Sequence, residues 1–223
     1  MIELAGQRAT ADAISIQNAR PPLAPTRGAQ GVSALLLAIY KGQTLTRDYL
    51  LACLPELDMF EAAAAGRCQR LQALLAQHPE TIDAFSPDGW SPLHLAAAFG
   101  GPRASCVLLA KGARLERISR NPQRRQPLHS AVALGRSLIT TRCLLQAGAD
   151  VNARQAGGYT PLHHASALGQ IEMVSLLLES GANPTLKCEW KKTPADYAQE
   201  RNHTAVASLL RETASRQELP PKK

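Results

Sequence analysis

Aromatic residues are scarce in this sequence: they make up 4% of its 223 residues, and only two of them are tryptophans. Apolar residues nevertheless amount to 45%, and Ala and Leu account for most of them. A β-sandwich core needs more aromatic and β-branched side chains, whereas Ala and Leu are strong helix formers. The composition therefore favours closely packed helices around a sizeable core.

Several kinds of segment and site are also missing. No run of about 18 apolar residues indicates a membrane span, and no signal peptide precedes the first motif. The five cysteines are an odd number without a C-x-x-C pair, which argues against a disulfide framework or a zinc site. Nucleophile elbows, phosphate-binding glycine loops and zinc-protease helices are absent too. We therefore expect no enzyme activity, no catalytic residues, no metal, no cofactor and no membrane association.

What the sequence does contain is an internal repeat. A Pro-Leu-His motif recurs, with successive prolines 35, 34 and 33 residues apart, the last in a degenerate form. A glycine follows eight residues after each of the first three prolines, and a Gly-Ala pair closes each Leu-rich stretch that comes next. The four motifs are SPLHLA at 91–96, QPLHSA at 126–131, TPLHHA at 160–165 and TPADYA at 193–198.

Each landmark has a physical reason. Ser or Thr before the proline caps a helix, and proline fits the first helical position because its missing N–H is not needed there. The glycine eight residues later is expected to end this helix by taking left-handed dihedral angles. The Leu-rich stretch is then a second helix that faces the core. Each period thus predicts a helix–turn–helix unit.

These motifs resemble the ankyrin repeat family. The residues that carry the resemblance are DGWSPLHLAA at 88–97, GADVNA at 148–153 and GYTPLHHA at 158–165. The resemblance implies an all-α solenoid of stacked antiparallel helix pairs with short β-hairpin-like fingers between them. It also implies that the chain binds other proteins.

The repeat divides the chain into four parts. Residues 1–30 lack a sustained period and are expected to be a disordered leader. Residues 31–57 read as an N-terminal helical cap, a degenerate repeat without a finger. Residues 58–212 form the ankyrin array, including a polar C-terminal cap of the kind that solenoids need. Residues 213–223 are expected to be a disordered tail.

Three histidines of the motif look at first like metal ligands or general bases. His94, His129 and His163 are 35 and 34 residues apart, so they occupy equivalent positions in successive units. In the ankyrin family, the histidine of this motif is implied to form hydrogen bonds with neighbouring backbone and to fix the turns. We therefore interpret all three as structural.

The fingers carry the stronger functional signal. Residues just before each motif are expected at finger tips, and residues just before the stop glycines on the adjoining concave face. Trp, Tyr and Arg dominate the binding energy of protein interfaces. Alternatively, the rings pack on neighbouring fingers and the charges are merely solvated. The predicted partner-binding residues are Asp88, Trp90, Arg124, Arg125, Tyr159, Trp190 and Lys192 on the fingers, and Phe99, Leu134 and Leu168 on the concave face.

The connection that carries Arg124 and Arg125 is two residues longer than the one after it and rich in arginine. With a net charge of +7, the chain suits a partner that has an acidic patch. The sequence therefore predicts a monomeric, cytoplasmic protein–protein interaction module, either a scaffold or a regulatory binder. The alternative is a nucleic-acid-binding protein that uses a basic aromatic ridge; no known nucleic-acid motif supports it.

Overall fold

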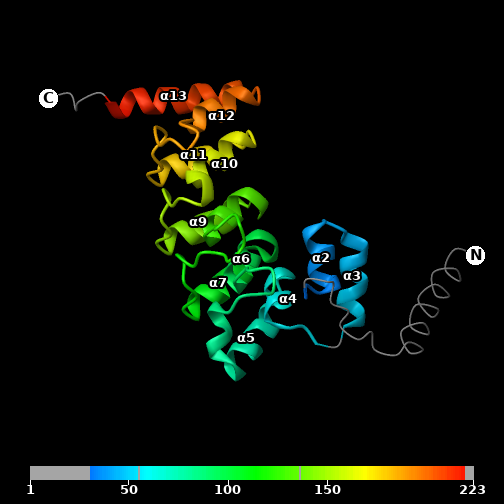
Figure 1. Ribbon diagram of the computed structural model, residues 1–223. Helices are drawn as coiled ribbons and strands as arrows, with labels where there is room; N and C mark the ends of the chain where they lie inside the picture. The colour runs from blue at the N-terminus through cyan, green and yellow to red at the C-terminus, as the bar shows by residue number, and fades with distance from the viewer. Residues whose placement is uncertain (1–30, 55, 136, 219–223) are drawn as a thin grey trace, which may run out of the picture. The chain divides into compact units, whose positions relative to one another are not determined.

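The computed structural model describes residues 31–54, 56–135 and 137–218, and all regular elements among them are helical. The expected leader, residues 1–30, lies outside the described residues. The chain divides into two compact units, Met1–Leu57 and Asp58–Lys223. Each unit is treated by itself, because their relative placement is not determined (Figure 1).

The described part of the first unit is a pair of helices, α2 (Ala34–Tyr40) and α3 (Thr44–Cys53). Ser33 caps α2, because its hydroxyl accepts a hydrogen bond from the backbone N–H of Leu36 at 3.3 Å. Gly42 takes a φ of +64° in the turn between the two helices, a conformation that glycine adopts without steric cost.

The second unit is a stack of five antiparallel helix pairs in chain order, from cyan to red in Figure 1. First helices contact first helices along the stack, and second helices contact second helices. The predicted solenoid is thus confirmed. The pairs are α4 (Met59–Ala64) with α5 (Cys68–Gln77), α6 (Pro92–Leu95) with α7 (Gly101–Ala110), α8 (Pro127–Ser130) with α9 (Leu138–Gln146), α10 (Pro161–Ala167) with α11 (Ile171–Glu179), and α12 (Pro194–Glu200) with α13 (Thr204–Glu218).

Four shorter segments extend α6 and α8 or lie in the loops. A π-helical turn, η2 (Ala96–Gly100), continues α6, and another, η3 (Ala131–Gly135), continues α8. Short 3-10 turns lie at η1 (Pro79–Asp83) and η4 (Ala156–Gly158). The first helices of the second and third pairs are therefore longer than α6 and α8 alone.

The core of the stack repeats from pair to pair. Equivalent leucines are at most 1% exposed, and each Leu removed from water in this way contributes about 2 kcal/mol. Since each pair buries its leucines only against its neighbours, the stack is stabilised by nearest-neighbour contacts. The leucines are Leu93, Leu128 and Leu162 in the first helices and Leu108, Leu144 and Leu177 in the second.

One stretch of the second pair, Pro92–Ala110, has the length and the mean hydropathy, 1.3, of a membrane-spanning helix. It does not run straight, since Gly101 breaks it with a φ of +80° between α6–η2 and α7. Half of it is buried inside the protein. Its apolar side chains include the core leucines of this pair, which accounts for its hydropathy.

The stop glycines behave differently from the expectation. Gly169 does take a left-handed φ of +67°, but Gly100 has a φ of −79°. The prediction is wrong for Gly100 because η2 runs through it and the reversal passes to Gly101. Gly100 is needed for a different reason: a Cβ atom there would collide with the backbone oxygen of Ala63 in the preceding pair.

The end of the array differs from the expectation as well. The sequence placed its end at residue 212, whereas α13 continues to Glu218. Polar composition alone does not end a helix, and no Gly or Pro interrupts this one. Two hydroxyls bond back to helix carbonyls, Thr213 to Leu209 at 2.8 Å and Ser215 to Arg211 at 3.0 Å. Residues 219–223 of the expected tail lie outside the described residues.

Candidate functional site

Four loops connect the helix pairs of the stack, and we call them the first to fourth fingers: residues 86–90, 119–125, 155–159 and 188–192. In each, the backbone N–H of the first residue donates to the carbonyl of the last at 2.8–3.0 Å. The second finger keeps this closure although it is two residues longer. The insertion that the sequence indicated is therefore contained within one finger.

The fingers are also bonded to one another. Arg120 of the second finger donates its backbone N–H to the carbonyl of Gly89 in the first at 2.8 Å. Equivalent bonds of 3.0 Å join the third finger to the second and the fourth to the third. A continuous row of backbone hydrogen bonds therefore holds the fingers, so their side chains are presented from a rigid support.

The motif histidines tie each helix pair to the next finger. The Nε2 of His94 lies 2.7 Å from the carbonyl oxygen of Arg125. The Nε2 atoms of His129 and His163 lie 3.2 Å from the equivalent carbonyl oxygens, those of Tyr159 and Lys192. A carbonyl only accepts, so Nε2 carries the proton and donates. Nδ1 is then the acceptor, and in His94 it receives the backbone N–H of Ser91 at 3.3 Å.

Both ring nitrogens of these histidines are thus occupied. Burial lowers the pKa of His94, His129 and His163 to about 4, so the rings are neutral at pH 7. Their geometry gives them a structural role. Among the described residues, no group of three or more His, Cys, Asp or Glu side chains could hold a metal ion.

In the first finger, the predicted site residues make contacts within the protein. Asp88 accepts a hydrogen bond from the hydroxyl of Ser86 at 2.6 Å. Trp90 is half-buried, and its ring centroid lies 5.5 Å from that of His94. These contacts shape and pack the finger, so they leave less of both side chains for a partner.

Two predicted basic residues are engaged as well. Arg125 is half-buried and donates from Nε to the side-chain oxygen of Gln155 at 3.1 Å, and burial lowers the pKa of its guanidinium. Lys192 forms an ion pair of 2.6 Å with Glu200. Each of these side chains ties one finger to an adjacent part of the stack.

The third and fourth fingers meet in an aromatic cluster of Tyr159, Trp190 and Tyr197. The rings of Tyr159 and Trp190 stack with centroids 5.4 Å apart and an angle of 30°, and the Tyr159 and Tyr197 hydroxyls lie 3.0 Å apart. Burial and this hydrogen bond raise the pKa of Tyr197 above its usual range. Trp190, however, stays 59% exposed. Sequence reasoning missed Tyr197, which lies inside a helix.

The penultimate residue of every finger has a left-handed backbone. It is glycine in the first and third fingers, Gly89 and Gly158, but Arg124 (φ +49°) in the second and Lys191 (φ +59°) in the fourth. A side chain costs about 1–2 kcal/mol in this conformation. Both Arg124 and Lys191 are exposed. The sequence predicted Arg124 as a tip residue but missed Lys191, although alignment of the four fingers shows a cation where glycine is the cheaper choice.

The residues predicted for a concave face differ in exposure. Leu134 is 40% exposed, while Phe99 and Leu168 are half-buried. The sequence missed exposed apolar residues at the starts of the second helices, next along the chain from Leu134 and Leu168. These are Leu138, Ile139 and Ile171, of which Ile139 is 65% exposed.

The repeated capping motif, the histidine-to-finger bonds and the stacked pairs agree with a family model for ankyrin repeats in three copies, which matches residues 59–155 and 138–218. The chain belongs to the ankyrin repeat family. Ankyrin repeats are non-catalytic modules that bind other proteins, so this array is a protein-interaction module.

Three relatives illustrate the range of proteins that carry similar arrays. The mouse B-cell lymphoma 3 protein homolog is 36% identical over 149 residues, which is 66% of this chain and 32% of that protein. The Drosophila melanogaster tyrosine-protein kinase Shark is 35% identical over 130 residues, 58% of this chain and 14% of the relative. The human ARF GTPase-activating protein GIT2 is 43% identical over 84 residues, 37% and 11% respectively.

The chain thus spans about a third or less of the length of these relatives. Their kinase and GTPase-activating functions are named for the whole proteins. What this chain shares with them is the ankyrin array.

Proposed function

We propose that the ankyrin array binds a folded partner protein through the tips of its second, third and fourth fingers. The observation that carries the proposal is the stacked pair of Trp190 and Tyr159. Trp190 keeps 59% of its surface exposed while its ring is held in place by a neighbouring ring. A rigid, exposed tryptophan loses little freedom on binding, which suits an interface hot spot.

The two cations in left-handed positions support the same surface. Arg124 and Lys191 keep charged side chains where glycine would relieve backbone strain. Strain of this kind clusters at functional sites. Positive charge on the second and fourth fingers suits a partner with an acidic patch.

Co-purification tests the surface directly. The tagged chain and its Trp190→Ala variant are compared by affinity purification with quantitative mass spectrometry. We expect the variant to lose its main partner by about 30-fold in affinity, which corresponds to ~2 kcal/mol. Leu45→Ala is the matched control, because Leu45 is an apolar side chain 87% exposed in the first unit. Equal partner recovery with both variants would refute the proposal.

A second pair of variants separates binding from folding. Arg124→Gly and Lys191→Gly relieve the left-handed strain, so each is expected to leave the free energy of unfolding unchanged or raise it by up to about 1 kcal/mol. Partner binding is expected to weaken in both. A loss of stability in these variants would show that the two side chains serve the fold instead.

Nucleic acid is the alternative partner, because aromatic rings and cations lie together on the fingers. Anisotropy of labelled single-stranded DNA and RNA at low salt distinguishes the two. Nucleic-acid affinity must fall steeply as salt is raised, in proportion to the phosphates neutralised. Saturable binding with such a slope, lost in Trp190→Ala, would favour this alternative over a protein partner.

We further propose that the chain acts as a monomer in the cytoplasm, with no cofactor and without enzymatic activity of its own. Its cysteines are free thiols, and those of Cys106 and Cys143 lie 3.7 Å apart on neighbouring helices. A reducing compartment suits thiols this close together. Size-exclusion chromatography with light scattering would test the monomer, and fractionation of the native cell the location.

A further inference from the structure

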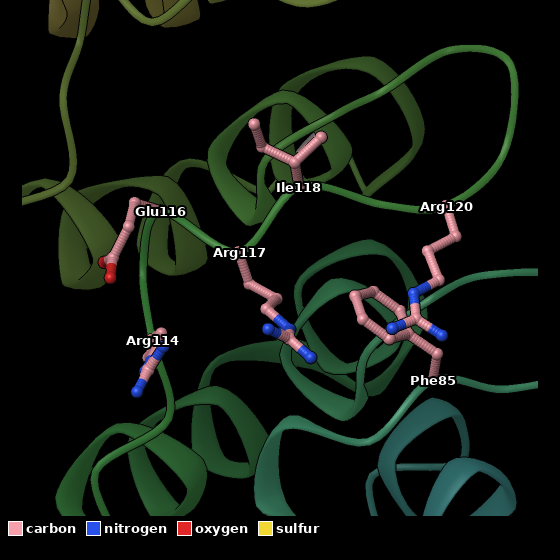
Figure 2. Close-up of a pocket in the computed structure, with 6 residues that line it drawn as sticks. All are labelled: Phe85, Arg114, Glu116, Arg117, Ile118 and Arg120. Atoms are coloured by element: carbon pink, nitrogen blue, oxygen red, sulfur yellow. The ribbon is translucent and has the colours of Figure 1, made fainter.

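A second feature of the array lies at the start of the second finger and in the chain just before it. From the end of α7 into this finger, arginine occupies every third position, and together with Phe85 this segment lines an open pocket of about 330 Å³ (Figure 2). Pockets of this size take small organic groups. Six residues line it: Phe85, Arg114, Glu116, Arg117, Ile118 and Arg120.

Two of the arginines share one aromatic ring. The guanidinium carbon of Arg117 lies 4.2 Å from the centroid of Phe85, and that of Arg120 lies 4.3 Å from it. Figure 2 shows both side chains reaching toward the ring from the same loop. Cation–π contacts stabilise each cation, but they do not neutralise its charge.

The charges of these two arginines are not balanced within the described residues. Arg114 pairs with the carboxylate of Asp83 at 3.5 Å, whereas Arg117 donates only to the backbone oxygen of Asp83, at 2.9 Å. No described carboxylate forms an ion pair with Arg117 or Arg120. The carboxylate of Glu116 points away from Phe85 (Figure 2).

Arg117 also has a buried donor without an acceptor. Its Nε is buried, and no described residue accepts a hydrogen bond from it. Leaving such a group unsatisfied costs free energy. The planar guanidinium presents its N–H groups in the geometry that phosphate and carboxylate oxygens accept.

The repeat itself does not require these arginines. The next repeat has other residues at the equivalent positions, counted from Gly112 and Gly148. Asp150 stands in place of Arg114, and Ala153 in place of Arg117. Asp150 supports its turn by accepting the backbone N–H of Asn152 at 2.9 Å, and Ala153 is buried. Arginine therefore replaces residues with local structural duties, which points to a ligand.

We propose that this cavity binds the phosphate monoester of a phosphorylated side chain in a partner peptide. Two unbalanced guanidiniums match the charge of a phosphate monoester, which is close to −2 at pH 7. The volume leaves room for the side chain that carries the phosphate. This inference rests on the proposed function only in that a partner protein supplies the peptide.

The test uses the ¹⁵N-labelled full chain and follows its arginine Nε–H signals by NMR. The probes are a short Gly-Ala peptide with a central phosphoserine, the same peptide with serine or glutamate, and inorganic phosphate. We expect saturable shifts of the Arg117 and Arg120 signals with the phosphopeptide. Its affinity should exceed those of the other probes by about tenfold or more, as charge-assisted bonds to a second charge allow.

Variants test whether Arg117 and Arg120 are the residues that bind the phosphopeptide. Arg117→Lys keeps the charge but loses the planar fork, and Arg120→Gln removes an exposed charge that the fold does not need. Each is expected to weaken phosphopeptide binding about tenfold, whereas Arg142→Gln, an exposed arginine elsewhere in the array, should not. Melting curves confirm that the variants fold, and the exposed Arg120 keeps the test valid if Arg117→Lys does not.

Three results would overturn the inference: no saturable shift at low salt, equal affinity for inorganic phosphate and phosphopeptide (a free oxyanion site), or equal weakening by Arg142→Gln. The two proposals fail separately. Trp190→Ala should leave phosphopeptide binding intact. If Arg117→Lys and Arg120→Gln retain the partner that Trp190→Ala loses, the finger-tip surface stands and the phosphate site does not.

Discussion

The two ends of the finger row use the same support for different side chains. Around the first and second fingers, one ring, Phe85, gathers the guanidiniums of Arg117 and Arg120. Around the third and fourth fingers, aromatic rings contact one another, and Trp190 stacks on Tyr159. We call these the basic end and the aromatic end.

Both ends rest on the same histidine bonds and the same finger-to-finger backbone ladder. The comparison shows that the ankyrin repeat sets the position of each finger, while the residues of that finger set the chemistry that the finger presents. Changes to the shared support should therefore affect both ends alike, and changes at the tips should affect one.

Low pH is expected to have the largest effect on the free energy of unfolding, and it should destabilise both ends. The pKa of His94, His129 and His163 is about 4 in the fold because the rings are buried, against ~6.5 in the unfolded chain. The unfolded chain therefore binds protons that the folded chain does not, so stability is complete above pH ~6.5 and is lost as the pH falls toward 4. One such shift is worth ~3 kcal/mol.

Urea unfolding between pH 7 and pH 4.5 measures this loss. His129→Gln, which keeps a donor and an acceptor without a titrating group, should make the dependence shallower, because it removes one of the buried titrating rings. A flat profile for the unchanged chain would contradict the structural role given to the histidines.

Truncation of core leucines should have the next largest effect on the free energy of unfolding, and the loss should be equal at both ends. Leu128 and Leu162 are equivalent and each is 1% exposed. Leu128→Ala and Leu162→Ala are each expected to lower the free energy of unfolding by about 2–5 kcal/mol. The exposed Leu45 provides the control, since Leu45→Ala should cost under ~0.5 kcal/mol. A loss under ~1 kcal/mol at Leu162 would mean that it does not lie in the core.

Alanine substitution of the finger glycines should destabilise the two ends to different extents. Gly89 and Gly157 have φ of +84° and +80°, so alanine costs about 1–2 kcal/mol at either from backbone strain. A Cβ on Gly89 would lie 2.8 Å from the backbone nitrogen of Asn121, next to Arg120, whose N–H is held in the ladder, whereas on Gly157 it meets the side chains of Trp190 and Tyr159. Gly89→Ala should therefore destabilise the protein more than Gly157→Ala in thermal unfolding; the reverse order would break the comparison.

The rings that define each end should have the smallest effect on stability. Trp190 is largely exposed, and Phe85 contacts arginines at the rim of a cavity. Trp190→Ala and Phe85→Leu are each expected to cost about 1 kcal/mol or less. Chemical denaturation measures both, with Leu162→Ala as the large-effect reference. A cost comparable to that of Leu162→Ala would show that the ring serves the core rather than binding.

Much of the fold followed from residue spacing, because a helix pair that buries one stripe must repeat its caps and leucines at fixed intervals. The limits of this reasoning are specific. Gly100 was predicted to reverse the chain, but a π-helical turn moved the reversal to Gly101, and Gly100 serves close packing on Ala63. A polar C-terminal stretch was expected to be disordered, yet α13 continues through it to Glu218.

For the candidate site, the repeat predicted where each residue lies in its finger but not how exposed its side chain is. Trp90, Arg125, Tyr159 and Lys192 occupy equivalent positions, as the repeat predicted, but all four are half-buried and make contacts within the protein. Only the structure showed Trp190 to be the exposed ring of the aromatic end. Exposure depends on neighbours from other repeats, and spacing within a repeat carries no information about them.

By itself, the sequence determined the period, the capping residues, the equivalent histidines and the one lengthened finger, since these depend on local geometry that each residue type favours. The tertiary structure alone decided that Phe85 meets Arg117 and Arg120 and that Tyr159 stacks on Trp190. These contacts join residues about 30 apart along the chain. They form only when helix pairs stack, because stacking brings side chains from successive units to the same height on one surface.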